Sequence, residues 1–150
     1  MALETLLVAV GTDDEGNTER LTETVTDIAG PAGTDVVLLH VFEEGGFQDL
    51  VDQIDHQPES GVDADGMARR TAAVQHISQA LDEAGVDYEV AGAIDEEPGS
   101  AVVETAERLG VDHLVVGGRK RSPVGKAVFG STTQSVVLNA PCPVTTVRRE

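Results

Sequence analysis

The stretch HLVVGGRKRSPVGKAVFGSTT, residues 113–133, joins an apolar run to the start of a helix through glycines and basic residues. Residues 113–116 have the length and composition of a buried strand. Ser131 opens a segment of helical period and forms an S-x-x-Q capping box with Gln134. Glycine lets backbone N–H groups approach a ligand closely, and the first N–H groups of a helix bind phosphate readily. The stretch therefore predicts an anion site that begins at Gly117 and ends at Thr133.

Basic residues are concentrated in this stretch. It holds four of the ten Lys and Arg residues of the chain, namely Arg119, Lys120, Arg121 and Lys126. The whole chain has 27 Asp and Glu residues and a formal net charge of -17. An anionic ligand would explain a basic cluster in so acidic a chain. The alternative is a solvated loop that pairs with carboxylates elsewhere on the surface.

Outward from this stretch, strand-like apolar runs alternate with segments of helical period. The expected strands are residues 6–10, 36–42, 86–94, 113–116 and 144–147. The expected helices begin at Asn17 or Thr18, at Met67, at Pro98 and at Ser131, and are ended by Gly30-Pro31 and Gly33, by Gly85, by Gly110 and by Pro141. Residues 43–66 form an acidic, glycine-rich connection in which Phe47, Leu50, Val51 and Ile54 suggest only a short helix.

This alternation predicts one α/β domain over residues 1–150, with a five-stranded parallel sheet and helices on both faces. In such a Rossmann-like sheet with the strand order 3-2-1-4-5, ligands bind where the order reverses, between strands one and four. The loop that contains Gly11, Thr12, Asp13 and Asp14 would then face the loop that begins at Gly117.

The strongly acidic composition excludes several classes of partner. A net charge of -17 would repel nucleic acid and anionic membranes. It favours a protein of a salt-rich cytoplasm, in which salt screens the self-repulsion, over an ordinary acidic cytosolic protein. No apolar run has the length of a membrane-spanning helix or an export signal, so we expect a cytoplasmic protein. The single cysteine, Cys142, excludes an intrachain disulfide.

The spacing of the glycines resembles the motif of the universal stress protein family. That motif is glycine, two residues, glycine, nine residues, then glycine with Ser or Thr. This chain has Gly117, Lys120 at the second glycine position, and Gly130-Ser131 after nine residues. Residues 39–41, 112–117 and 140–144 also resemble the family, so the resemblance covers essentially the whole chain.

The resemblance implies an adenine-nucleotide α-hydrolase-like fold and a site for ATP or another adenine nucleotide, with Mg²⁺ as a candidate companion. The family motif holds ribose and phosphates, the backbone of Val41 would meet the adenine, and Val116 would line its pocket. The nucleotide-binding residues expected by position are Gly11, Thr12, Asp13, Val41, Val116, Gly117, Arg119, Lys120, Gly130, Ser131, Thr132 and Thr133. The chain departs from the family at Lys120 and at Gly11, where an aspartate is common.

The last strand predicts an oligomer. Residues 144–147 would form an edge strand, and exposed edges need to be covered, charged or paired. Universal stress proteins commonly dimerise through this strand. We therefore expect a homodimer whose edge consists of Val144, Thr145, Thr146 and Val147.

The sequence leaves other functions open. Asp13 and Asp14 also resemble the Mg²⁺-holding acids of a receiver domain, but Asp95 is a poor phosphorylation site and the lysine that should end strand five is missing. Histidines show no metal-ligand spacing, Cys142 has no neighbour that would activate it, and no base is paired with a nucleophile. We expect a stress-response binding module; the alternatives are a nucleotide-free interaction module and a weak ATPase.

Overall fold

The computed structural model describes residues 4–11, 14, 16–54, 63–121 and 127–148, and six strands and six helices lie within this part of the chain. The strands are β1 (Thr5–Ala9), β2 (Asp35–Phe42), β3 (Tyr88–Ile94), β4 (His113–Arg121), β5 (Ala127–Phe129) and β6 (Val144–Arg148). The helices are α1 (Thr18–Ala32), α2 (Glu44–Ile54), α3 (Ala64–Arg70), α4 (Ala72–Ala84), α5 (Pro98–Leu109) and α6 (Ser131–Asn139).

The strands form one sheet built around β1. Strand β1 pairs in parallel with β2 on one side and β4 on the other, so that Leu7 lies opposite both Val37 and Leu114. Strands β3 and β6 extend the sheet in parallel beyond β2 and β4. The five parallel strands therefore have the order β3-β2-β1-β4-β6, which confirms the predicted Rossmann-like fold.

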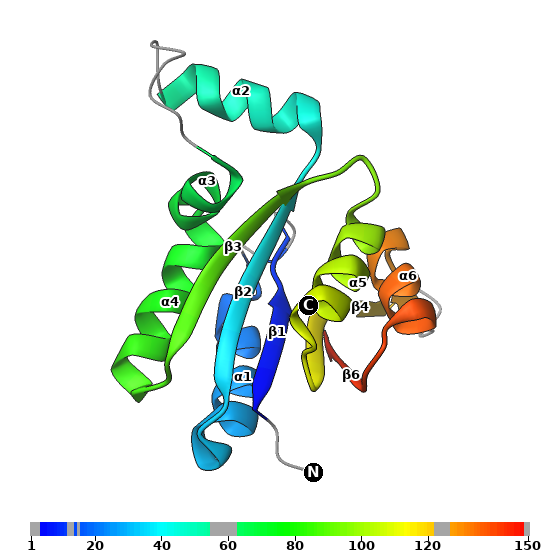
Figure 1. Ribbon diagram of the computed structural model, residues 1–150. Helices are drawn as coiled ribbons and strands as arrows, with labels where there is room; N and C mark the ends of the chain where they lie inside the picture. Colours follow the sequence, from blue (N-terminus) through cyan, green and yellow to red (C-terminus); the bar gives the residue numbers. More distant parts are fainter. Residues whose placement is uncertain (1–3, 12–13, 15, 55–62, 122–126, 149–150) are drawn as a thin grey trace.

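Helices cover both faces of the sheet (Figure 1). Leu6, Val8 and Val10 point into the core under α1 and α4, whereas Leu7 and Ala9 point into the core under α5 and α6. Successive side chains of a strand face opposite sides, and β1 is buried on both. This explains why the apolar run of the first strand is continuous and does not alternate.

The first helix ends at Gly33, the last of the residues that the sequence predicted to end it, and not already at Gly30-Pro31. Helix α1 runs through Gly30 and Pro31 to Ala32 and stops at Gly33, whose φ of 63° is left-handed. The N–H of Thr34 donates to the carbonyl of Ala29 at 3.0 Å, which closes a Schellman-type end. Pro31 lies in the last turn of the helix. Its ring is compatible with the helical φ angle, and its missing N–H removes only one backbone hydrogen bond.

The helix expected from Met67 to Gly85 is in fact two helices. Thr71 adopts an extended conformation between α3 and α4, and its hydroxyl donates to the carbonyl of Ala68 at 2.9 Å. Met67 and Ala68 pack with Phe42 and Phe47 in a separate cluster that α2 helps to form. The two helices bury their apolar faces in different clusters, and a helical period alone does not reveal such a break.

The segment that follows Gly117 is also different from its prediction. We expected a basic loop, but β4 continues to Arg121 and pairs in antiparallel fashion with β5. Arg119 lies opposite Phe129 and Lys120 opposite Val128. This pairing satisfies backbone groups that a loop would leave to water.

Helix α3 packs tightly against the edge strand β3. The N–H of Gly92 donates to Oδ1 of Asp65 at 2.7 Å. A Cβ at Gly92 would collide with the backbone carbonyl of Ala64. The contact covers part of the β3 edge, which an exposed strand requires, and it positions the Arg70 end of α3.

Replacing Gly92 by Ala should therefore destabilise the protein by about 2–3 kcal/mol, since the added methyl group must displace backbone. Gly30→Ala is the matched control, because a Cβ at Gly30 meets nothing within 4 Å. Its stability should be unchanged or slightly higher. Denaturant unfolding measures both, and equal stability of the two variants would contradict the close contact.

Candidate functional site

A cavity of about 740 Å³ opens at the carboxyl ends of β1, β2 and β4. The chain leaves β1 toward β2 on one side, and β4 flanks β1 on the other side, so this is the point where the strand order reverses. Most of the buried lining of the cavity, which forms its floor, is apolar and consists of Ala9, Val10, Leu39, Val41, Phe42, Val102 and Val116, and the buried imidazole of His40 also lines it. Such a cavity suits a ligand with a flat apolar part and a polar end.

The start of α6 forms one wall of this cavity. Gly130, Ser131, Thr132 and Thr133 all line it. Gly130 is the N-cap in an extended conformation, and as a glycine it has no side chain that could cap the helix. The predicted S-x-x-Q capping box is therefore wrong, because Ser131 is the first helical residue and not the cap. The N-cap residue therefore leaves the first amides of α6 to another acceptor, and an anion is a suitable one.

Two contacts hold α6 in this position. The buried hydroxyl of Thr133 donates to the carbonyl of Gly117 at 2.9 Å and joins the helix start to strand β4. On the other side, a Cβ at Gly99 would come within 2.6 Å of the Cβ of Ser135, so α5 and α6 pack with little space between them. These contacts preorganise the helix terminus relative to the sheet.

The carboxylate of Asp14 also lines the cavity. Its side chain is buried, and its Oδ2 accepts a hydrogen bond from the N–H of Gly11 at 2.8 Å. Its other oxygen lies against Gly117, where no Cβ would fit. A glycine at position 117 is therefore required by the packing of a carboxylate. The sequence predicted only that the loops of Gly11 and Gly117 face each other.

The structure brings together most of the predicted nucleotide-binding residues that it describes. Those that line the cavity are Gly11, Val41, Val116, Gly117, Gly130, Ser131, Thr132 and Thr133. Thr12 and Asp13 lie outside the described residues. For Arg119 and Lys120 the structure describes the backbone, which belongs to the β4–β5 hairpin.

Sequence reasoning missed the wall formed by α2, α3 and α4. This wall consists of Glu43, Gly46, Leu50, Arg70, Thr71, Ala72 and Ala73. In the sequence, the only sign of this wall was the length of the connection 43–66, because long connections are often functional. No local pattern shows that Arg70 faces the same cavity as Ser131.

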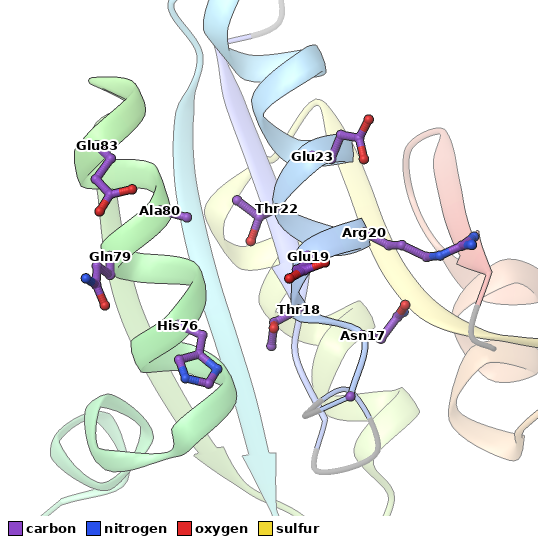
Figure 2. A pocket seen from close by; sticks show the side chains of 11 residues that line it. Asn17, Thr18, Glu19, Arg20, Thr22, Glu23, His76, Gln79, Ala80 and Glu83 are labelled. Atoms are coloured by element: carbon purple, nitrogen blue, oxygen red, sulfur yellow. The ribbon is translucent and has the colours of Figure 1, made fainter.

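A second, more open cavity of about 920 Å³ lies between α1 and α4 (Figure 2). Its side chains include Glu19, Glu23 and Glu83, which are exposed on the two helices. The part of the chain that the structure describes contains no group of three or more His, Cys, Asp or Glu residues placed to hold a metal ion. Across the same residues, no helix combines the length and apolar character needed to cross a membrane.

Two described side chains have shifted pKa values. Burial, and then the negative charge of Asp112, raise the pKa of the Cys142 thiol, which therefore remains protonated at neutral pH. Nε2 of His113 lies 2.7 Å from Oγ1 of Thr145, and burial lowers the pKa of this histidine. Neither side chain is among the lining residues of the cavity.

Sequence comparison finds relatives in one family. The model of the universal stress protein family matches residues 5–148. A universal stress protein of Mycolicibacterium smegmatis is 29% identical over 84 residues, which cover 56% of this chain and 65% of that protein. The "Universal stress protein in QAH/OAS sulfhydrylase 3'region" of Thermus aquaticus is 33% identical over 85 residues, 56% of this chain and 62% of that protein. The matches thus span less than two thirds of these relatives' lengths.

Solved structures share the fold. The universal stress protein of Archaeoglobus fulgidus in complex with dAMP has a TM-score of 0.65 and 19% identity, with coverage of 98% of this chain and 99% of that one. A universal stress protein in complex with cAMP has a TM-score of 0.67 and 17% identity over the full length of both chains (100% and 100%). An Arabidopsis thaliana family protein with AMP bound has a TM-score of 0.64 and 18% identity, with coverage of 98% and 92%. At these identities the likeness demonstrates a common fold.

Removing the Thr133 hydroxyl should weaken the junction of α6 and β4. Thr133→Val keeps the shape of the side chain but leaves the Gly117 carbonyl without its donor, which should cost about 1–2 kcal/mol of unfolding free energy. Thr132→Val is the control, because Thr132 is only half-buried. Equal unfolding free energies of the two variants would show that the Thr133 bond does not anchor the helix.

Proposed function

This chain belongs to the universal stress protein family, and we propose that it is a stress-response module that binds an adenine nucleotide in the cavity at the carboxyl ends of β1, β2 and β4. The observation that carries the proposal is the uncapped start of α6, which borders a cavity with an apolar floor. An anion-binding helix terminus beside an apolar surface matches the two halves of a nucleotide. The AMP, dAMP and cAMP complexes of the structural neighbours support the same ligand class.

In this proposal the base lies on the apolar floor and its edge meets the backbone of Val41. The first amides of α6 and the hydroxyl of Ser131 hold the phosphate, Gly117 lies beside the ribose, and Val116 lines the pocket of the base. Gly11, Thr12, Asp13, Arg119, Lys120, Gly130, Thr132 and Thr133 complete the proposed site. A Mg²⁺ ion that accompanies ATP would take most of its ligands from phosphate oxygens and water, as Mg²⁺ commonly does.

The proposed role is binding and regulation, with ATP hydrolysis slow or incidental. Hydrolysis requires a group that orients or deprotonates water, and no base is paired for that purpose among the described residues. One observation favours the rival role of a nucleotide-free interaction module. Lys120 replaces the second glycine of the motif, and its backbone pairs with Val128 in the hairpin. The family's close backbone approach at this position is then not available to phosphate.

We also propose that the protein acts as a homodimer in a salt-rich cytoplasm. Strand β6 pairs with β4 along one edge, and its other edge has no partner strand among the described residues. Val144, Thr145, Thr146 and Val147 could pair there with the same strand of a second copy. A net charge of -17 would hinder this association in dilute buffer, and salt would screen it.

Calorimetric titration tests nucleotide binding. ATP, ADP and AMP are titrated into the protein in about 1 M salt, with and without Mg²⁺, and we expect dissociation constants on the order of micromolar. Ser131→Asp should weaken binding at least about tenfold, because the carboxylate would repel the phosphate from the helix terminus. The same substitution should leave the folded state intact, since an acid at a helix N-terminus is stabilising.

Gln79→Glu is the matched control for this experiment. It adds the same charge on the exposed face of α4, on the open cavity shown in Figure 2 and away from the proposed site. Its affinity should equal that of the wild type. Absence of heat and of any thermal shift with all three nucleotides would leave the interaction module as the better account.

Light scattering tests the dimer. In about 1 M salt we expect a mass of twice the 15.7 kDa subunit, because the self-repulsion is screened and the β6 edges can pair. Lowering the salt should shift the mass toward one subunit. A mass of one subunit at high salt would refute the dimer.

A further inference from the structure

Arg70 is placed at the cavity by the break between α3 and α4. The N–H and the hydroxyl of Thr71 both donate to the carbonyl of Ala68, at 3.2 Å and 2.9 Å. The extended Thr71 turns the chain, so that Arg70, Thr71, Ala72 and Ala73 all line the cavity. Arg69, the preceding residue with the same charge, does not line it.

The wall that carries Arg70 lies across the sheet from the wall that carries Ser131. Helices α3 and α4 lie on one side of β1 and β2 in Figure 1, and α5 and α6 lie on the other. Both walls belong to the same cavity of about 740 Å³. A ligand bound at the start of α6 therefore has Arg70 on its far side.

The charge at this wall is unusual for so acidic a chain. Arg70 is the only Lys or Arg among the described lining residues, which also include the carboxylates of Asp14 and Glu43. Its side chain is exposed, and it forms no ion pair with any carboxylate that the structure describes. Its planar guanidinium is suited to bidentate contact with phosphate oxygens.

The polarity of the cavity decides which part of a nucleotide meets Arg70. The buried floor is apolar and suits the base, whereas Arg70 is exposed at the rim, where a solvated phosphate chain would extend. We infer that Arg70 contacts the outer phosphates of a nucleotide whose first phosphate is held by α6, and so selects for the length of the phosphate chain. This inference rests on the proposed nucleotide site.

The test compares ATP, ADP and AMP by calorimetry with the wild type, Arg70→Ala, Arg70→Lys and the control Arg69→Ala. Both arginines are exposed and adjacent, so the two alanine variants have the same net charge. Thermal unfolding of each variant checks that it is folded. We expect the wild type to bind ATP more tightly than AMP. Arg70→Ala should lower the affinity for ATP about threefold to tenfold and the affinity for AMP less than about twofold, which is the effect of losing a partly exposed charged hydrogen bond.

The control and the lysine variant make the result specific. Arg69→Ala should leave the ratio of the ATP and AMP affinities unchanged. Arg70→Lys should keep part of the preference for ATP that Arg70→Ala loses, since lysine keeps the charge without the bidentate fork. An unchanged ratio in Arg70→Ala, or an equal loss for AMP and ATP, would overturn the assignment of Arg70 to the outer phosphates. A wild type that binds none of the three nucleotides would instead overturn the proposed function itself, and with it the inference.

Discussion

The structure depends on the burial of strand β1 between two neighbouring strands and two layers of helices. Leu6, Leu7 and Val8 are fully inaccessible to solvent, and all of β1 pairs in parallel on both sides. Burial of each such side chain contributes about 1.5–3 kcal/mol. Its backbone groups could not be buried without partners, so the pairing with β2 and β4 accompanies the burial. A helix or a turn at this position would lose both the burial of the side chains and the pairing of the backbone.

The functional cavity follows from the same arrangement. Parallel strands place their carboxyl ends at one edge of the sheet, and the connections that follow β1 and β4 run to opposite sides, which leaves a space between them. The chain then closes this space with small residues and one buried carboxylate. Gly117 accommodates Asp14, and Gly99 lets α6 approach α5. Thr133 joins α6 to β4, so the anion-binding terminus is held by the core of the fold.

The polar groups of the cavity are of several kinds. They are backbone amides, hydroxyls, the buried carboxylate of Asp14, the exposed carboxylate of Glu43, the buried imidazole of His40 and the exposed guanidinium of Arg70. These groups can orient and neutralise a phosphate chain. The titratable groups with shifted pKa values, His113 and Cys142, are not among its lining residues. Glu19, Glu23 and Glu83 are exposed on the outer faces of α1 and α4.

The sequence alone determined the fold and part of the site. Alternating apolar runs and helical periods are local signals, so they predicted the parallel sheet with helices on both faces, and the glycines beside Ser131 predicted a helix start at the cavity. Only the tertiary structure decided the rest, because it depends on contacts between residues far apart in the chain. The Thr71 break reflects two separate apolar clusters, the β4–β5 hairpin reflects backbone pairing, and Gly130 became the N-cap through the junction of α6 with β4. The position of Arg70 across from Ser131 follows from the packing of α3 on β3, which no local pattern encodes.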